Sequence, residues 1–166
     1  MKLLFISLGC DKNLVDSEVM LGELSKRGYS FTEDETEAEV IVINTCCFIN
    51  DAKEESINTI LEMAEYKNAG SCKALIVTGC LAQRYRQEII DEIPEVDAVL
   101  GTTSFDHICE AVENALGGQH LTKFDDLQKL VKSENHRILT TGGHYAHLKI
   151  AEGCDKHCTY CIIPKI

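Results

Sequence analysis

Nine cysteines make sulfur the most prominent chemistry in this chain of 166 residues. Their number is odd, and 45% of the residues are hydrophobic, so a chain of this length can form a core without disulfide staples. This composition fits a reducing compartment better than a secreted disulfide framework. Metal ligation is therefore the leading explanation for the cysteines, and a cytoplasmic location is expected.

The most specific cysteine pattern is the segment EGCDKHCTYC, where Cys154, Cys158 and Cys161 are spaced C-x3-C-x2-C. Iron–sulfur clusters are normally held by four thiolates, so three from one loop leave one iron of a four-iron cluster without a protein ligand. Such an open position allows a metal centre to bind and activate a substrate. A structural zinc site completed by His157 is an alternative, because zinc also accepts cysteines at these gaps.

A second set of cysteines is scattered along the first half of the chain. Cys10, Cys46 and Cys80 each lie one or two residues beyond an apolar run, namely LLFISL, VIVIN and ALIVTG. If these runs are parallel strands, their carboxyl ends meet at one edge of the sheet, where such folds bind ligands. The sequence therefore predicts that the three thiols converge on a second metal or cluster site.

Only one cysteine of the pair Cys46 and Cys47 is expected to face that site, because successive side chains near a strand end point to opposite sides. We favour Cys46, since it follows its strand in the same way as the cysteines of the other two loops. Cys72 and Cys109 are interpreted as packing residues, because free cysteine is often buried as a small hydrophobic side chain.

The elements that must position these cysteines indicate an α/β fold. Continuous apolar runs at 3–8, 40–44, 74–79 and 98–101 predict strands buried on both faces, with helical patterns between them. A weaker strand is expected near YSFTE. We therefore predict a three-layer domain over residues 1–118, with a mostly parallel sheet and helices on both faces.

The remainder of the chain reads as a different module. Residues 119–136 are polar and mixed and are interpreted as a linker. Residues 137–151 predict a hairpin that turns at Gly142 and Gly143. Residues 137–166 would then begin a second domain, of which this chain holds only the start.

The charge balance limits the possible partners. The chain has 16 basic and 27 acidic side chains, a formal net charge of -11. This charge repels phosphate backbones, so nucleic-acid binding through this part of the protein is not expected, whereas a cationic partner is favoured. The apolar start of the chain is too short for a secretory signal, and no run reaches the length of a membrane span.

Four segments together resemble the radical S-adenosylmethionine methylthiotransferase family. They are SLGCDKNLVDSE, INTCCFI, VTGCLAQRY and GCDKHCTYCIIP. The resemblance covers essentially the whole chain, and all six family cysteines have a match at Cys10, Cys46, Cys80, Cys154, Cys158 and Cys161. It implies two 4Fe-4S clusters, of which the one on Cys154, Cys158 and Cys161 binds S-adenosylmethionine.

Two branches of this family differ in their substrate. Three local features resemble the RimO type, which modifies an aspartate of a ribosomal protein. They are the tripeptide DKN after Cys10, the tripeptide FIN after Cys46 and Cys47, and Asp155 after Cys154. The resemblance thus implies transfer of a methylthio group to the β-carbon of that aspartate, with a reductant protein as a further partner. Asp11 departs from the pattern, because the RimO type commonly has proline there.

Two alternatives remain at this point. One is the branch of the family that modifies a tRNA adenosine, and the other is a non-catalytic iron–sulfur or zinc binding module. The family also continues past IIPKI through a radical enzyme barrel and a small β-barrel. We therefore expect this chain to be an N-terminal fragment that does not turn over on its own.

Overall fold

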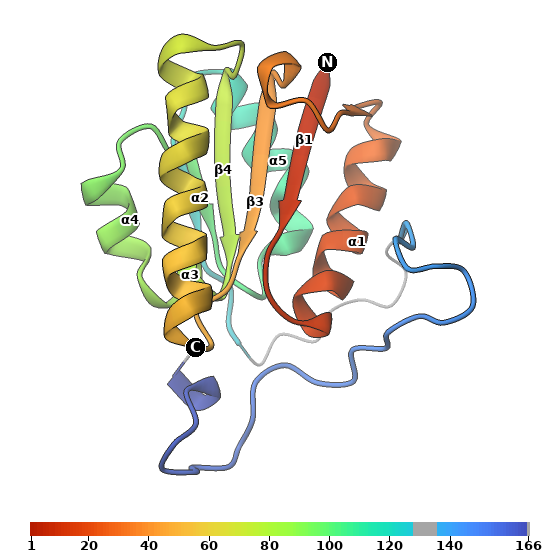
Figure 1. The fold of residues 1–166 in the computed structure, drawn as a ribbon, viewed down its shortest axis with the longest axis vertical. Coiled ribbons are helices and arrows are strands. Elements are labelled where there is room, and N and C mark those ends of the chain that lie inside the picture. The colour runs from red at the N-terminus through yellow and green to blue at the C-terminus, as the bar shows by residue number, and fades with distance from the viewer. Residues whose placement is uncertain (128–135, 166) are drawn as a thin grey trace.

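The computed structural model describes residues 1–127 and 136–165. Its centre is a six-stranded sheet in the order β2-β1-β3-β4-β5-β6, in which every neighbouring pair is parallel (Figure 1). The strands are β1 (Lys2–Ser7), β2 (Ser30–Phe31), β3 (Val40–Thr45), β4 (Ala74–Gly79), β5 (Ala98–Leu100) and β6 (Leu121–Lys123).

Helices cover both faces of this sheet. One face packs against α2, α3 and α4, and the other packs against α1 and α5 (Figure 1). The predicted three-layer α/β domain with a parallel sheet is therefore confirmed. The helices are α1 (Asp11–Lys26), α2 (Asn50–Ala69), α3 (Cys80–Arg84), α4 (Arg86–Glu92) and α5 (Ile108–Leu116), and short 3-10 turns occur at η1 (Glu35–Glu37), η2 (Phe105–His107) and η3 (Ile163–Lys165).

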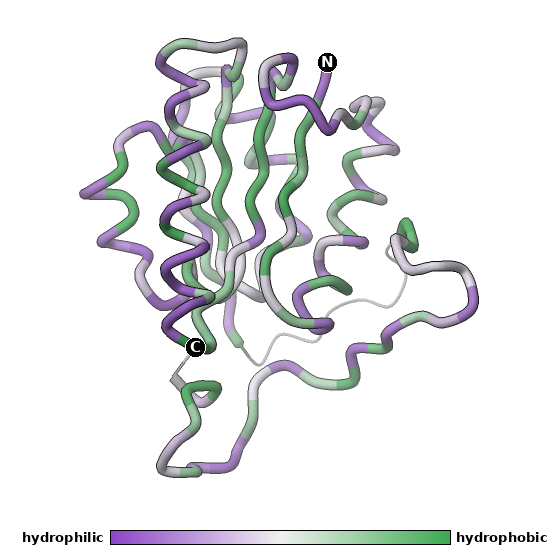
Figure 2. The backbone as a smooth tube through the Cα atoms, in the orientation of Figure 1, coloured by the Kyte–Doolittle hydropathy of each residue, from purple (hydrophilic) through white to green (hydrophobic). Residues whose placement is uncertain are grey.

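The apolar runs form the strands because the two layers of helices bury both of their faces. Every residue of β3 and β4 is buried, and the strands form the hydrophobic centre of the molecule (Figure 2). Strands of this kind need no polar alternation, which explains why continuous hydrophobic runs identified them. The weak strand expected near YSFTE is the short edge strand β2.

The strand order has a consequence for ligand binding. The chain moves outward from β1 to β2, then returns to β3 on the other side of β1, so the direction of winding reverses between β1 and β3. In doubly wound sheets, ligands bind beyond the carboxyl ends of the strands at this reversal. The register aligns Ser7 with Asn44 and Thr45 with Gly79, so the three neighbouring strands end at about the same level.

Two predictions about the second half of the chain need correction. Strand β6 lies inside the segment 119–136 that was predicted as a linker, because it pairs with β5 and extends the sheet beyond residue 118. The hairpin predicted for residues 137–151 is wrong, since this segment contains no strand. Its backbone instead bonds to α1, where Ile138 N donates to Glu18 O at 3.0 Å. Residues 128–135 of the predicted linker lie outside the described residues.

Within residues 1–127 and 136–165, none of the helices is both long and apolar enough to cross a membrane.

Candidate functional site

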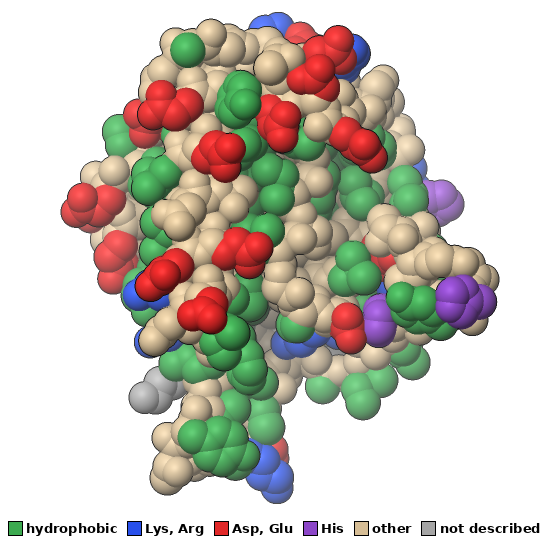
Figure 3. Space-filling view, viewed as in Figure 1, with side chains coloured by type: hydrophobic (Ala, Val, Ile, Leu, Met, Phe, Trp, Pro, Cys, Tyr) green, Lys and Arg blue, Asp and Glu red, His purple; other side chains and the backbone are tan. Residues whose placement is uncertain are grey.

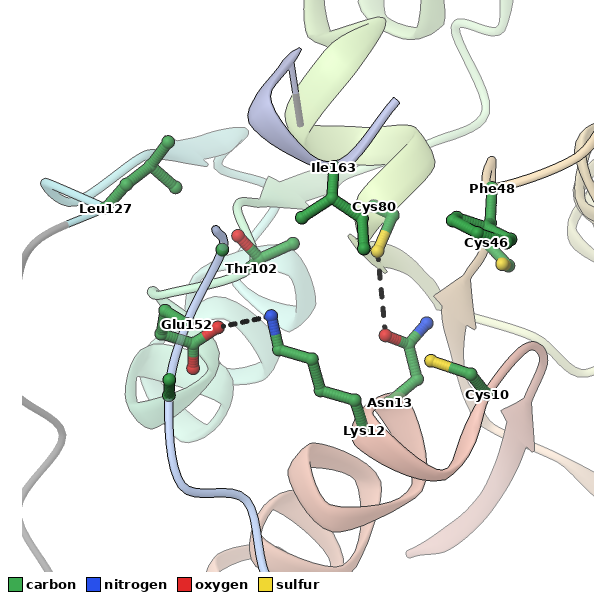
Figure 4. Close-up of a pocket in the computed structure, with 12 residues that line it drawn as sticks. Cys10, Lys12, Asn13, Cys46, Phe48, Cys80, Thr102, Leu127, Glu152 and Ile163 are labelled. Carbon is green, nitrogen blue, oxygen red and sulfur yellow. Dashed lines mark hydrogen bonds and ion pairs between the residues drawn. The ribbon is translucent and has the colours of Figure 1, made fainter. Parts of the chain in front are cut away.

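Three strand ends deliver the first set of cysteines to one pocket. Cys10 follows β1 and precedes α1, Cys46 directly follows β3, and Cys80 is the first residue of α3 after β4. All three line a pocket of about 150 Å³ at the carboxyl edge of the sheet (Figure 4). The structure therefore brings together residues that are separated by up to 70 positions. Their role as ligands stays a prediction.

Two glycines allow the loops of this pocket to come close together. Gly9 has φ +106°, and a Cβ there would lie 2.8 Å from Cys46 Cβ and 3.1 Å from Cys46 Sγ. Gly79 has φ +93°, and its Cβ would lie 2.3 Å from Asn44 Oδ1. Both backbone conformations strain other residues, and both spaces are filled by neighbouring atoms. The glycine before Cys10 and the glycine before Cys80 are thus part of the geometry of the site.

Two buried asparagines connect the loops. Asn13 Nδ2 donates to Thr45 O at 2.9 Å and to Leu8 O at 3.3 Å, while its Oδ1 accepts from Cys80 Sγ at 3.6 Å (Figure 4). Asn44 Nδ2 donates to Asn13 O at 3.0 Å. Sequence reasoning missed both residues, although Asn44 is a polar residue at the end of a buried strand and Asn13 closely follows Cys10.

The structure separates the two cysteines of the doublet. Cys46 lines the pocket, whereas Cys47 belongs to the hydrophobic core on the α2 side of the sheet. The backbone of Cys46 is fixed by α2, because Ser56 Oγ accepts from Cys46 N at 3.0 Å and donates to Cys46 O at 2.9 Å. This arrangement supports the choice of Cys46 as the ligand.

Burial favours the protonated form of the Cys80 thiol when no cation is present. Burial raises the pKa of Cys80 to about 12, and negative charge on Cys47, Cys46 and Cys10 acts in the same direction. Burial likewise raises the pKa of Cys47. A metal centre would reverse this balance, because thiolates are the form that binds metal and binding releases their protons.

The three sulfurs are not arranged as the ligands of a single zinc ion. Ligands of one tetrahedral zinc ion, at about 2.3 Å from the metal, lie about 4 Å from each other. In the described part of the chain, Cys10, Cys46 and Cys80 do not form a group whose ligand atoms all lie within 4.8 Å of one another. Three thiols around a pocket of this size can instead surround a multi-iron cluster and leave one iron open.

The second cysteine set lies on an irregular segment beside the same pocket. Cys154 and Cys158 are exposed and Cys161 is half-buried, with Cys161 N donating to Cys158 O at 3.1 Å. Residues 151–153 and Ile163 line the pocket of the first set (Figure 4). The residues on both sides of the second cysteine set therefore contact the pocket of the first set.

The remaining candidates do not line this pocket. Cys72 is buried in the core, and Cys109 packs half-buried against the α1 and α5 side. His157, the alternative zinc ligand, is exposed. His147 Nε2 lies 3.6 Å from Asp11 Oδ1.

One group of possible metal ligands was not predicted. Asp106, His107 and Asp125 bring one ligand atom each within 4.8 Å of the others. His107 also bonds through Nδ1 to Glu110 Oε2 at 3.1 Å, and Lys123 contacts the same carboxylate at 3.3 Å. The group is a mixed-charge network beside β5 and β6.

The sequence of the chain was compared with protein families and with curated proteins. The model of a family described as "Uncharacterized protein family UPF0004" matches residues 2–101, the region that forms β1 to β5. Curated relatives cover the whole chain or nearly so. A "Ribosomal protein uS12 methylthiotransferase RimO" of Lachnoclostridium phytofermentans is 68% identical over 166 residues, which are 100% of this chain and 38% of the relative.

Relatives from other bacteria carry the same name. The protein of Clostridium tetani is 52% identical over 97% of this chain and 36% of its own length, and that of Solibacter usitatus is 51% identical over 99% and 35%. The chain thus spans less than two fifths of the length of these relatives. The predicted relationship to RimO-type methylthiotransferases is confirmed. Because the family model matches more than half of its residues, the chain belongs to the UPF0004 family and is similar to RimO methylthiotransferases over its whole length.

Proposed function

We propose that this chain forms the N-terminal part of a radical S-adenosylmethionine enzyme that transfers a methylthio group to the β-carbon of an aspartate in ribosomal protein uS12. The observation that carries the proposal is the shared pocket of Cys10, Cys46 and Cys80 in a chain 68% identical to a RimO protein. The donor set fits one 4Fe-4S cluster with an open iron.

The residues of the pocket would hold a cluster and shield it from water. Cys10, Cys46 and Cys80 supply three thiolates, and Asn13 fixes the loops that carry two of them. Phe48 and Ile163 add apolar lining, which lowers the access of water to the cofactor. Cys154, Cys158 and Cys161 would hold the second cluster. When bound, the two clusters and S-adenosylmethionine supply the radical and sulfur chemistry of the reaction.

The charge of the chain fits a protein substrate from the ribosome. Acidic side chains are spread over the face that α2 occupies (Figure 3), and the net charge is -11. Such a surface attracts a cationic protein and repels a phosphate backbone at long range. This favours a ribosomal protein over tRNA as the partner of this part of the enzyme. A reductant protein would be a further partner.

The test is the mass of uS12 from cells that carry the full-length gene, cells that lack it, and cells with the Cys46→Ala variant. We expect a methylthio group on an aspartate of uS12 only in the first case. Nucleoside analysis of tRNA from the same cells provides the comparison. A methylthio group on tRNA adenosine that depends on the gene, with unmodified uS12, would refute the proposed substrate.

A further inference from the structure

Residues 136–152, here called the strap, run along α1 toward its N-terminus. Near the C-terminal half of α1, His136 N donates to Glu23 Oε1 at 3.2 Å. At the N-terminal turns, Lys12 Nζ pairs with Glu152 Oε2 at 3.0 Å. The strap therefore follows α1 from Glu23 to its N-terminal turns, next to the first cysteine site, and Figure 1 shows it beside the N-terminal part of the helix.

Gly22 permits this close approach. A Cβ on Gly22 would lie 2.1 Å from His136 O and 2.6 Å from His136 C. These are backbone atoms, which cannot rotate away as the end of a side chain can. Glycine in the middle of a helix costs about 1 kcal/mol relative to alanine. The contact with the strap supplies a packing reason for a residue that the helix alone would not favour.

A buried carboxylate anchors the strap one turn further along α1. The side chain of Glu18 is fully buried and accepts from Thr140 N at 2.6 Å, Thr140 Oγ1 at 2.9 Å and Arg137 Nε at 2.7 Å. Burial acts to raise the pKa of Glu18, but the bonds from Thr140 and Arg137 together lower it below its usual value. Glu18 is thus held as a carboxylate whose partners come mainly from the strap.

Four side chains of alternating charge connect the strap and α1 next to the first cysteine site. Lys149 Nζ donates to both carboxylate oxygens of Asp16, at 2.7 and 2.8 Å, and also pairs with Glu152. Glu152 in turn pairs with Lys12, whose side chain extends along the pocket (Figure 4). Only 10% of the Lys149 side chain and 11% of the Asp16 side chain are exposed. Loss of one charge from such a buried pair leaves the other unpaired, which is strongly destabilising.

The end of this network coincides with the lining of the first site. Ala151, Glu152 and Gly153 line the pocket of Cys10, Cys46 and Cys80, and Cys154 of the second set follows directly. We propose that Lys12 and Asp16 are positioning residues which, by holding Glu152 and Lys149, keep residues 151–153 against this pocket and so fix the second cysteine set beside the first. The importance of this arrangement for catalysis rests on the proposed function, but the arrangement itself does not.

The test measures the labelling rate of each cysteine by iodoacetamide in the metal-free chain, with mass spectrometry to resolve the sites. In Lys149→Met, we expect Cys46 and Cys80 to react about tenfold faster, which corresponds to about 1.4 kcal/mol in the equilibrium for local opening. Cys72 lies in one core and the half-buried Cys109 packs against the other, and both serve as internal controls. Their labelling rates should stay unchanged.

Lys12 provides a milder variant, because 39% of its side chain is exposed and its replacement leaves the core intact. We expect a severalfold faster reaction of Cys46 and Cys80 in Lys12→Met and rates close to the unmodified chain in Lys12→Arg, which keeps the charge. The same rates in Lys12→Met as in the unmodified chain would overturn the proposal. Equal acceleration of all four cysteines in Lys12→Met would overturn it as well. Neither result depends on methylthio transfer, which is measured separately on uS12.

Discussion

At the scale of single residues, the doublet Cys46–Cys47 shows how two neighbouring cysteines after a strand come to lie in different surroundings. Both side chains are buried, at 4% and 3% exposure, so burial does not distinguish them. Their surroundings do, because Cys46 lines the pocket and Cys47 packs in the apolar core. Alternation along an extended chain is the physical reason for the difference.

We therefore predict opposite effects for two neighbouring substitutions. Cys46→Ala should abolish the visible absorbance of the iron–sulfur cluster at the first site after anaerobic reconstitution, because it removes one of three thiolates. Cys47→Ala should retain this absorbance and lower the free energy of unfolding by roughly 1 kcal/mol, as expected for a small loss of buried volume. Absorbance that survives in Cys46→Ala and disappears in Cys47→Ala would reverse the assignment.

At the scale of elements, α1 has two functions in the fold. Its apolar side packs on the sheet through Val19, Met20 and Leu24. Two of its acidic side chains, Asp16 and Glu18, make polar contacts with the strap. A sequence scan sees only an amphipathic surface helix with scattered acidic residues. The structure shows that two of these acids are buried by a segment more than 100 positions away.

The substitution Gly22→Ala tests the contact between α1 and the strap. Alanine should favour the isolated helix by about 1 kcal/mol. In the folded chain, however, the new Cβ would collide with the backbone at His136, and such overpacking typically costs about 1 to 3 kcal/mol. We expect urea unfolding to give a lower free energy of unfolding for this variant.

Ser25→Ala is the matched control, because Ser25 is exposed on the same helix. This change should leave stability unchanged or raise it slightly, by the same helix propensity. A stabilised Gly22→Ala variant would mean that the strap does not lie against Gly22 in solution.

At the scale of the whole molecule, the two cysteine sets differ in how well the described residues enclose them. The first set lies at the ends of β1, β3 and β4, with Cys46 buried, Cys80 half-buried and only Cys10 exposed. In the second set, Cys154 and Cys158 are exposed on a segment without regular structure. An enclosed site shields a cluster from solvent, whereas an exposed site leaves it open to loss.

The iron content of this 166-residue chain should reflect that difference. After anaerobic reconstitution, we expect at most about four irons per chain, the content of one cubane cluster. The triple variant Cys10→Ala, Cys46→Ala, Cys80→Ala should lose nearly all of this iron. The corresponding triple variant of Cys154, Cys158 and Cys161 should keep most of it. Clearly more than four irons per chain would show that the second set binds a cluster without further enclosure.

The sequence by itself determined the parallel sheet and the positions of the cysteines at its edge. Buried parallel strands require continuous apolar runs, and the loops after them necessarily share one side of the sheet, so local patterns carry this information. The cysteine spacings and the quoted motifs also identified the family. Gly9 and Gly79 were visible as residues, but their close contacts with Cys46 and Asn44 were not.

Only the tertiary structure decided how residues 136–152 are used. Their pattern predicted a hairpin, because alternation and a pair of glycines are the local signals of one. In the folded chain, the buried carboxylates of Asp16 and Glu18 form hydrogen bonds and ion pairs with this segment. These bonds hold the segment against α1. The pairing of these carboxylates with the strap depends on which charges, distant in the sequence, are buried together on folding. The local hydrophobic pattern of the sequence contains no information about such pairs.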